Sequence, residues 1–221
     1  MVKYLCIIQA RISSSRLPGK VMLDLGGKTL LERVYNTISK SKKINRIIIA
    51  TSNQEQDDLI ENKLKMLNIE CFRGDLENVL QRFFYASKFY KAENIVRITA
   101  DNPMMDFRII DELISYYEKS NCDYSTFSNG IYGLSSEVFS QKSLQQAYDH
   151  SRNDHDREHV TPYIKSNCKV GIVDISKKYK KPEISVTIDT LEDYIKIQNF
   201  YLFCEVNSIE ANIDNFLLYS K

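Results

Sequence analysis

The stretch from Tyr4 to Val21, which reads YLCIIQARISSSRLPGKV, most constrains what this chain can fold into. Its first residues are apolar or β-favouring, which indicates a strand buried on both faces, as in a parallel sheet. A polar loop follows at once and carries Arg11, Arg16 and Lys20 among serines. Loops at the carboxyl ends of parallel strands are where α/β folds bind ligands. Cations, hydroxyls and free backbone N–H groups there favour a polyanion, most simply a triphosphate, and the alternative is a solvated basic loop.

Short apolar runs alternate with amphipathic segments between residues 29 and 127. Further strands are expected at Ile44–Ala50, Ile69–Phe72, Asn94–Ala100 and Cys122–Phe127, with helices at Thr29–Lys40, Gln56–Leu67, Asn78–Lys91 and Asp106–Ser120. Strands that alternate with helices of about 10–15 residues predict βαβ crossovers and a mostly parallel sheet. The length of 221 residues favours one α/β domain over residues 1–221.

The alternation weakens after Ser128. We expect helices at Gln141–Asp149 and Leu191–Cys204, a charged segment at Ser151–Glu158, and strands at Val170–Ile175 and Ile184–Ile188. We interpret residues 128–180 as an elaboration of the domain that selects an acceptor and mediates dimerisation. Its apolar and aromatic side chains have no obvious place in a single domain and resemble an interface patch: Tyr132, Leu134, Val138, Phe139, Tyr148 and Tyr163. The alternative is that they cover one end of the chain's own sheet.

Bulk properties argue against several classes of partner. Lys and Arg number 30 and Asp and Glu 29, so the chain lacks the dominant basic surface of a nucleic-acid-binding protein. No apolar run approaches the roughly 18–20 residues of a membrane span. Five scattered cysteines without C-x-x-C spacing favour reduced thiols. We therefore expect a cytoplasmic protein with neither nucleic acid nor membrane as a partner.

Two aspartates follow predicted strands, Asp101 after NIVRITA and Asp189 after ISVTI. A carboxylate at the ligand edge of the sheet, facing a basic loop, suits Mg²⁺, which takes one or two carboxylates plus phosphate oxygens. For Asp189 the alternative is helix N-capping. Other phosphate motifs fail: Met22 stands where a P-loop ending at Gly27-Lys28-Thr29 needs glycine, and no G-x-G-x-x-G follows a strand.

Taken together, several segments resemble the signature of CTP-dependent sugar cytidylyltransferases. In chain order they are Gln9–Arg11, Ser15–Lys20, Leu25–Arg33, Arg97–Pro103, Arg157–Tyr163 and Val186–Asp193. The chain is most similar to the spore-coat polysaccharide biosynthesis group, and the 3-deoxy-manno-octulosonate (KDO) and acylneuraminate enzymes are more distant. The resemblance implies a three-layer α/β/α nucleotide-diphospho-sugar transferase fold, related to GT-A glycosyltransferases. It also implies transfer of CMP from CTP to a sugar, sugar acid or sugar or polyol phosphate, with release of pyrophosphate, for surface polysaccharide or glycan synthesis.

The resemblance also implies roles for individual residues. Catalysis would rest on Arg16, Lys20 and Asp101, and Mg²⁺, or Mn²⁺ in its place, would bind Asp101 and Asp189. The nucleotide-binding set is Gln9, Ala10, Arg11, Ser15, Arg16, Lys20, Asn78, Arg82 and Asp101. Relatives are commonly dimers, so we expect a C₂ homodimer through the 128–180 region, with Arg157 or His159 near the acceptor.

Two departures from the family pattern bear on the acceptor. Gln9 stands where the KDO and acylneuraminate enzymes usually carry proline, and Asn102 replaces a cysteine or glutamate. Both point away from KDO or a sialic acid as the acceptor. Two alternatives stay open: a sugar-phosphate nucleotidyltransferase using another NTP, and a GT-A-like glycosyltransferase, for which Asp154-His155-Asp156 is the single D-x-D in the sequence.

Overall fold

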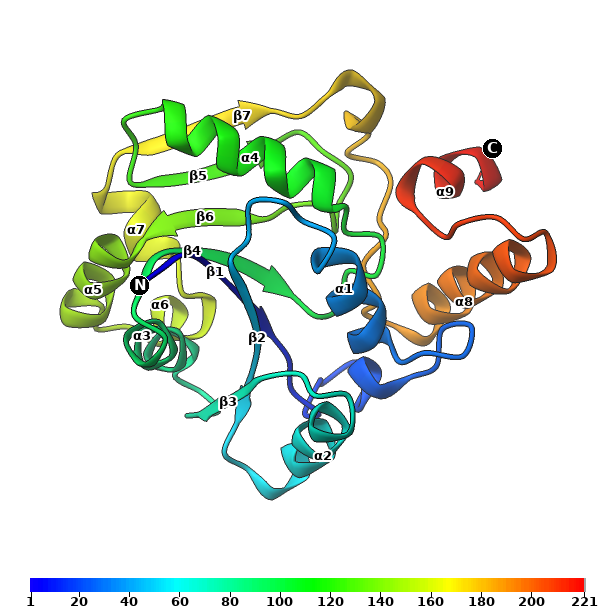
Figure 1. Ribbon diagram of the computed structural model, residues 1–221, viewed down its shortest axis with the longest axis horizontal. Helices are drawn as coiled ribbons and strands as arrows, with labels where there is room; N and C mark the ends of the chain where they lie inside the picture. The colour runs from blue at the N-terminus through cyan, green and yellow to red at the C-terminus, as the bar shows by residue number, and fades with distance from the viewer. Residues whose placement is uncertain (221) are drawn as a thin grey trace.

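A seven-stranded sheet forms the centre of the protein, seen here in a computed structural model that describes residues 1–220 (Figure 1). Its strands are β1 (Val2–Gln9), β2 (Arg46–Ser52), β3 (Cys71–Gly74), β4 (Ala92–Thr99), β5 (Tyr124–Ser128), β6 (Glu137–Ser140) and β7 (Val170–Asp174). They lie in the order β3-β2-β1-β4-β6-β5-β7. Every neighbouring pair is parallel except those that β6 makes with β4 and β5. The predicted mostly parallel sheet is confirmed.

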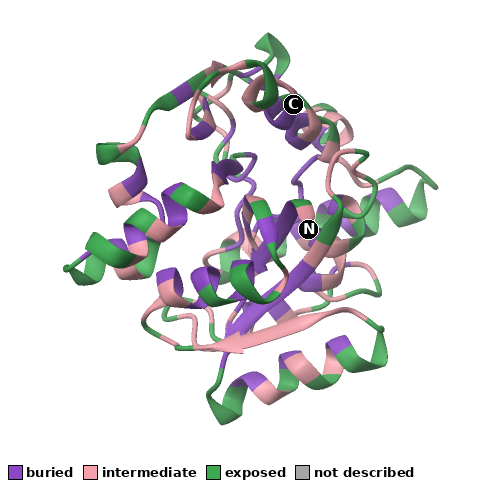
Figure 2. Cartoon of the chain, turned by 60° about the vertical axis from the view of Figure 1, so that its left-hand side comes forward, coloured by how far each residue is buried: buried purple, intermediate pink, exposed green. Residues whose placement is uncertain are grey.

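Helices cover both faces of the sheet and make it the middle of three layers. One face carries α1 (Leu30–Ile38), α2 (Asp58–Met66), α4 (Phe107–Lys119), α8 (Leu191–Val206) and α9 (Ile213–Tyr219). The other carries α3 (Val79–Phe89), α5 (Gln141–His150) and α7 (Pro162–Asn167), with α6 (Asp154–His159) beside α3 and α7. Buried residues follow the strands in the interior, and exposed residues gather on the outer helices and loops (Figure 2).

The central strand β1 is buried on both faces, as its apolar run predicts. Leu5 and Ile7 pack in the apolar cluster beneath α3 and α5, and Cys6 and Ile8 pack in the cluster beneath α1 and α4. Neighbours on both sides complete its backbone hydrogen bonds, because β1 is parallel to β2 and to β4. A strand held this way fixes the position of the loop that leaves its carboxyl end.

The helix that follows this loop begins where the sequence predicts. Thr29 accepts a hydrogen bond from the Glu32 backbone N–H at 3.2 Å, and the Glu32 carboxylate accepts one from the Thr29 N–H at 2.7 Å. This reciprocal capping box satisfies N–H groups that the first turn leaves free. The buried side chains of α1 then recur at helical spacing: Leu30, Leu31, Val34 and Ile38.

The second half of the chain differs from the sequence prediction in several places, and the helices α7 and α9 had no predicted counterpart. The predicted strand Ile184–Ile188 is wrong: this segment joins no strand of the sheet and makes only an isolated bridge, between Ser185 and Tyr132. The charged segment Ser151–Glu158 contains α6, capped by the Asn153 side chain. The short strand β6 was not predicted, because four residues give almost no periodicity and an antiparallel strand breaks the βαβ pattern.

The expectation that the apolar side chains of residues 128–180 lack a place within one chain is largely wrong. Leu134, Val138 and Phe139 are fully buried in the chain's own core. Tyr148 and Tyr163 are partly buried against the cluster beneath α3 and α5. Tyr132 alone among the six is largely exposed. The alternative, that these residues cover the chain's own sheet, accounts for most of them.

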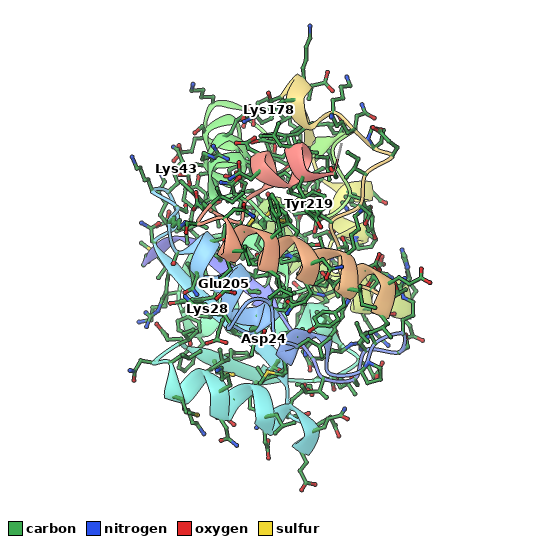
Figure 3. The ribbon with its side chains drawn as sticks, turned by 90° about the vertical axis from the view of Figure 1, so that its right-hand side faces the viewer. Asp24, Lys28, Lys43, Lys178, Glu205 and Tyr219 are labelled. Atoms are coloured by element: carbon green, nitrogen blue, oxygen red, sulfur yellow. The ribbon has the colours of Figure 1, made fainter. Side chains whose placement is uncertain are left out.

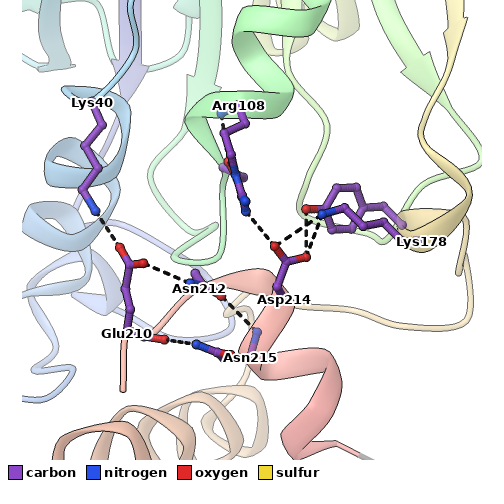
Figure 4. Close-up of polar contacts among 9 residues, drawn as sticks. Lys40, Arg108, Lys178, Glu210, Asn212, Asp214 and Asn215 are labelled. Carbon is purple, nitrogen blue, oxygen red and sulfur yellow. Dashed lines mark hydrogen bonds and ion pairs between the residues drawn. The ribbon is translucent and has the colours of Figure 1, made fainter. Parts of the chain in front are cut away.

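The C-terminal helices lie along one side of the molecule, with Glu205 on α8 and Tyr219 on α9 (Figure 3). Asp214 anchors α9, since its carboxylate accepts hydrogen bonds from Arg108 at 2.9 Å and from Lys178 at 3.0 Å (Figure 4). Within residues 1–220, no helix combines the length and apolar character needed to cross a bilayer.

Candidate active site

A cavity of about 770 Å³ opens at the carboxyl ends of β1 and β4. Most of the predicted site residues line it: Gln9, Ala10, Arg11, Ser15, Arg16, Lys20, Arg82, Asp101, His159 and Asp189. Two do not. Asn78 instead caps α3, accepting a hydrogen bond from the Gln81 N–H, and Arg157 pairs with Asp154 one turn earlier on α6.

A buried aspartate that the sequence analysis did not single out holds the basic loop against the sheet. Asp57 is fully buried, and its carboxylate accepts hydrogen bonds from the Ile12 N–H at 2.8 Å and from Thr51 and Ser52 at the end of β2. Gly19, at φ 73°, closes the loop by donating its N–H to the Ile12 carbonyl at 2.9 Å. Asp57 lies in a charged run typical of a surface helix, so the sequence gives no signal of this role.

Lys20 brings the two predicted aspartates together. Its ammonium donates hydrogen bonds to Asp101 Oδ2 at 2.8 Å, Asp189 Oδ1 at 2.9 Å and the Ile188 carbonyl at 2.8 Å. Arg16 also pairs with Asp189, at 3.0 Å. Two carboxylates, of Asp101 and Asp189, therefore lie against two cations, of Lys20 and Arg16. The Lys20 residue is only 8% exposed. The predicted proximity of Asp101 and Asp189 is found.

A close-packed polar contact fixes both aspartates to the sheet. Asn102 donates to Thr99 Oγ1 at 2.7 Å and accepts from Thr187 Oγ1 at 2.7 Å. The Ile188 N–H donates to the Asp101 carbonyl at 2.9 Å. Gly133, at φ 102°, lies against this contact, because a Cβ there would stand 2.7 Å from Thr187 Oγ1. A side chain at position 133 would separate the segments that carry the aspartates.

Arg82 is a buried cation with unpaired donors. It is 2% exposed, and among the described residues its Nε and one terminal nitrogen have no hydrogen-bond partner. Burial lowers the pKa of its guanidinium to about 10, so it stays charged at neutral pH. The side chain packs against Gly74, where a Cβ would stand 3.0 Å from Arg82 Cγ. Unpaired buried polar groups are rare in native proteins and indicate a missing partner.

A second, largely buried ion pair lines the same cavity. Arg97 on β4 stands directly opposite Glu137 on β6, and the two side chains pair at 2.5 Å. Lys165 from α7 pairs with the same carboxylate at 2.6 Å. Sequence analysis assigned no site role to any of the three: Arg97 opens the signature segment Arg97–Pro103, but its partner strand β6 was not predicted, and no motif contains Glu137 or Lys165.

The decisive comparison is with known families. The sequence profile of the cytidylyltransferases matches residues 5–215. The chain belongs to this family. The spore coat polysaccharide biosynthesis protein SpsF of Bacillus subtilis is 35% identical over 208 residues, 89% of this chain and 85% of that protein. An uncharacterized protein of Methanocaldococcus jannaschii is 41% identical over 206 residues, 90% of this chain and 85% of its own length.

More distant relatives and solved structures agree. A 3-deoxy-manno-octulosonate cytidylyltransferase of Francisella philomiragia is 29% identical over 153 residues, 67% of this chain and 60% of that enzyme. The structure of a cytidylyltransferase from Leptospira borgpetersenii matches with a TM-score of 0.84 at 28% identity, over 92% of this chain and 88% of that one. The nucleotidyltransferase class and the fold predicted from the sequence are confirmed.

Within residues 1–220, no cluster of three or more His, Cys, Asp or Glu side chains is arranged to hold a metal ion. Asp101 and Asp189 form a pair of carboxylates joined through Lys20. All five cysteines are free, and Cys6 and Cys204 are buried.

Proposed function

We propose that this cytidylyltransferase transfers CMP from CTP to a sugar, sugar acid or sugar or polyol phosphate and releases pyrophosphate. The observation that carries the proposal is the arrangement of the cavity. Two cations and two aspartates meet at the ends of the strands, and the buried, unpaired Arg82 lines the same space. The relationship to SpsF supports a place in surface polysaccharide or glycan synthesis.

The basic loop is the proposed triphosphate site. Arg11, Arg16 and Lys20 all line the cavity, and Asp57 holds the loop that carries them. Arginine donors in a fork suit phosphate oxygens, and lysine supplies a compact charge. The alternative of a solvated basic loop does not explain why Lys20 is buried between two carboxylates.

The pair Asp101 and Asp189 fits a divalent cation. Mg²⁺ is usually bound by one or two carboxylates together with substrate phosphates, which is the donor set available here. Bound there, Mg²⁺ or Mn²⁺ would supply Lewis-acid stabilisation of phosphate charge. Lys20 and Arg16 together balance the two carboxylates in this structure, so a divalent cation would take over this role if both side chains turned to the triphosphate.

The chemistry needs no covalent enzyme intermediate. An acceptor oxygen attacks the α-phosphorus, a new P–O bond forms, and the bond to the pyrophosphate oxygen breaks with its electron pair. Arg16 and Lys20 offset the charge that develops on the leaving pyrophosphate. A hydroxyl acceptor loses its proton to water, and a phosphate acceptor has none to lose. Positioning and electrostatics supply the catalysis.

The glycosyltransferase alternative loses its main sequence support. Asp154 and Asp156 belong to α6, and neither lines the cavity. Asp156 instead accepts a hydrogen bond from Asn153 at 2.9 Å, and the Asp154 side chain is fully exposed. A D-x-D metal site of a glycosyltransferase would have to face the nucleotide.

The Arg82→Met variant is expected to gain stability and lose affinity for CTP. A buried polar group without a partner destabilises a protein by about 1–3 kcal/mol, and methionine removes that cost. If Arg82 hydrogen-bonds the base or ribose, its loss should weaken CTP binding by about tenfold or more. Urea denaturation and calorimetric titration measure the two effects, with the exposed Arg46→Met as control. Undiminished CTP affinity would contradict the assignment.

We also propose that the protein is a homodimer in solution. Most of the apolar side chains of residues 128–180 that suggested an interface cover the chain's own sheet instead. However, β7 is an edge strand of the sheet, and the side chain of its Ile172 is 61% exposed. Exposed edge strands with apolar side chains readily pair with a second chain. Light scattering at micromolar concentration should give twice the chain mass of 25.7 kDa. The Ile172→Lys variant should give half the wild-type mass. The control variant Leu59→Lys, at an exposed residue of α2, should keep the wild-type mass. A wild-type mass of 25.7 kDa would refute the dimer.

A further inference from the structure

A row of polar side chains crosses the face of the sheet beneath the cavity and has no part in the proposed nucleotide contacts except at one end. Gln9 comes from β1, Arg97 from β4, Glu137 from β6 and Lys165 from α7, and all four line the cavity. Arg97 Nε donates to Gln9 Oε1 at 3.0 Å. Glu137 then joins Arg97 to Lys165. Buried charges carry a desolvation cost, so a row of this kind inside a cavity calls for a functional reason.

Glu137 cannot itself bind a ligand, because its oxygens are already occupied. Oε1 accepts hydrogen bonds from Tyr124 at 2.6 Å and Thr161 at 2.9 Å as well as the Lys165 ammonium, and Oε2 accepts from Arg97. Burial by itself would raise the pKa of this carboxyl, but the charges of Arg97 and Lys165 and the hydrogen bonds lower it to about 2. It is therefore an ionised support that holds the two cations in place.

Both cations line the cavity and keep N–H donors that no described residue accepts. Among the described residues, the second terminal nitrogen of Arg97 has no hydrogen-bond partner. The Lys165 side chain is 47% exposed and pairs with Glu137 alone. Two positive charges against one negative charge leave the row with one positive charge. Glu158, another carboxylate that lines the cavity, pairs with Arg11 instead, at 3.8 Å. The row thus offers N–H donors and positive charge, which match an anion.

The backbone beside this row is strained. Val160 joins α6 to α7 at φ 69° and ψ −51°, with the Thr161 N–H bonded to the His159 carbonyl at 2.8 Å. This turn is rare, and a β-branched residue at positive φ is an outlier that costs about 1–3 kcal/mol. It directs Thr161 to Glu137, leaves His159 lining the cavity and starts the helix that carries Lys165. Such strain concentrates at ligand sites.

We propose that Arg97 and Lys165, held by Glu137, bind an anionic group of the acceptor, a carboxylate or a phosphate. The inference rests on the proposed function, because it assigns the acceptor half of the same cavity. It narrows the acceptor from sugars in general to sugars or polyols that carry a negative charge. Arg97 and Lys165 would then be specificity-determining residues that act on binding of the acceptor.

Calorimetric titration of the full chain can test this with matched probes. The protein is first saturated with Mg²⁺ and a CTP analogue carrying a methylene bridge between its α- and β-phosphates, which prevents turnover. Glucose, glucuronate and glucose 6-phosphate are then titrated separately. Because a hydrogen bond to a charged group contributes about 1.5–3 kcal/mol, one of the anionic probes should bind about tenfold or more tightly than glucose. If glucuronate binds most tightly, the anionic group of the acceptor is a carboxylate. If glucose 6-phosphate binds most tightly, that group is a phosphate.

Variants assign the effect to this row. Arg97→Gln and Lys165→Gln should abolish the preference for the anionic probe while the CTP analogue binds as before. Because the Lys165 side chain is half exposed, Lys165→Gln should fold even if Arg97→Gln does not. Lys169→Gln, at an exposed lysine outside the row, is the matched control and should keep the preference for the anionic probe. Equal binding of all three probes, or a preference that survives in both variants, would overturn the inference. Failure of the wild-type chain to bind the CTP analogue would instead refute the proposed function.

Discussion

Replacement of Asp101 by asparagine is expected to lower the rate of pyrophosphate release by about a thousandfold or more, which corresponds to about 4 kcal/mol in the barrier. Asp101 follows β4 and shares Lys20 with Asp189. The variant removes half of the carboxylate pair that would hold the divalent cation and leaves Lys20 with Asp189 alone. Turnover of the wild-type chain should accordingly require Mg²⁺ or Mn²⁺. Pyrophosphate release from CTP, with and without each metal, measures both effects.

The control for this experiment is an aspartate at another strand end. Asp174 ends β7, and its side chain is 71% exposed beside Lys180. Asp174→Asn should retain the wild-type rate, and circular dichroism should give the same spectrum for both variants. Full activity of Asp101→Asn in excess chelator would remove the metal assignment.

The Glu137→Gln variant is expected to lose about 3 kcal/mol of folding stability. Removing one partner of a buried ion pair leaves the other charge uncompensated, which typically destabilises by about 3–5 kcal/mol. The Arg97 and Glu137 side chains are only 15% and 10% exposed, so solvent screens this pair weakly. Urea denaturation at neutral pH measures the loss. Glu70→Gln, which breaks an exposed pair with Arg46, should stay within about 0.5 kcal/mol of the wild type.

The same pair predicts a pH dependence. The folded-state pKa of Glu137, about 2, lies below the value of about 4.3 for an unfolded glutamate. The ionised carboxylate therefore stabilises the fold fully above the unfolded-state pKa, and this contribution is lost as the pH falls toward 2. The stability difference between the wild type and Glu137→Gln should shrink over that range. A difference that stayed constant down to the lowest pH at which both fold would contradict this explanation.

The part of the fold that could be predicted from the sequence is the part governed by local patterns. The apolar run of β1, the capping box of Thr29 and Glu32 and the rhythm of strands and helices each have a short-range signal. The strand ends follow from that rhythm, and in a parallel sheet they meet at one edge. This is why Lys20 and Asp101 could be brought together on sequence evidence. Asp189 was placed beside them through a predicted strand that does not form, and the Lys20 ammonium and the Ile188 N–H, which donates to the Asp101 carbonyl, hold it there instead.

What the sequence could not predict depends on long-range pairing. Arg97 and Glu137 face each other only because β6 pairs antiparallel with β4, and Asp57 reaches Ile12 across 45 positions of the chain. No periodicity or motif marks these contacts. Asn78 and Arg157 were assigned by resemblance in sequence, but their side chains are engaged by their own helices, with Gln81 and Asp154. The ion pair of Arg97 and Glu137, which we propose to support acceptor binding, therefore emerged only from the structure.

The central claim is that this cavity selects CTP. Calorimetric titration of the full chain with CTP, UTP, GTP and ATP, each with Mg²⁺, tests it most directly. A site that hydrogen-bonds one base edge leaves buried groups unpaired with the wrong base, and Arg82 supplies such buried donors. We predict that CTP binds about a hundredfold more tightly than the other three nucleotides. Binding of UTP or GTP as tight as that of CTP would contradict the account.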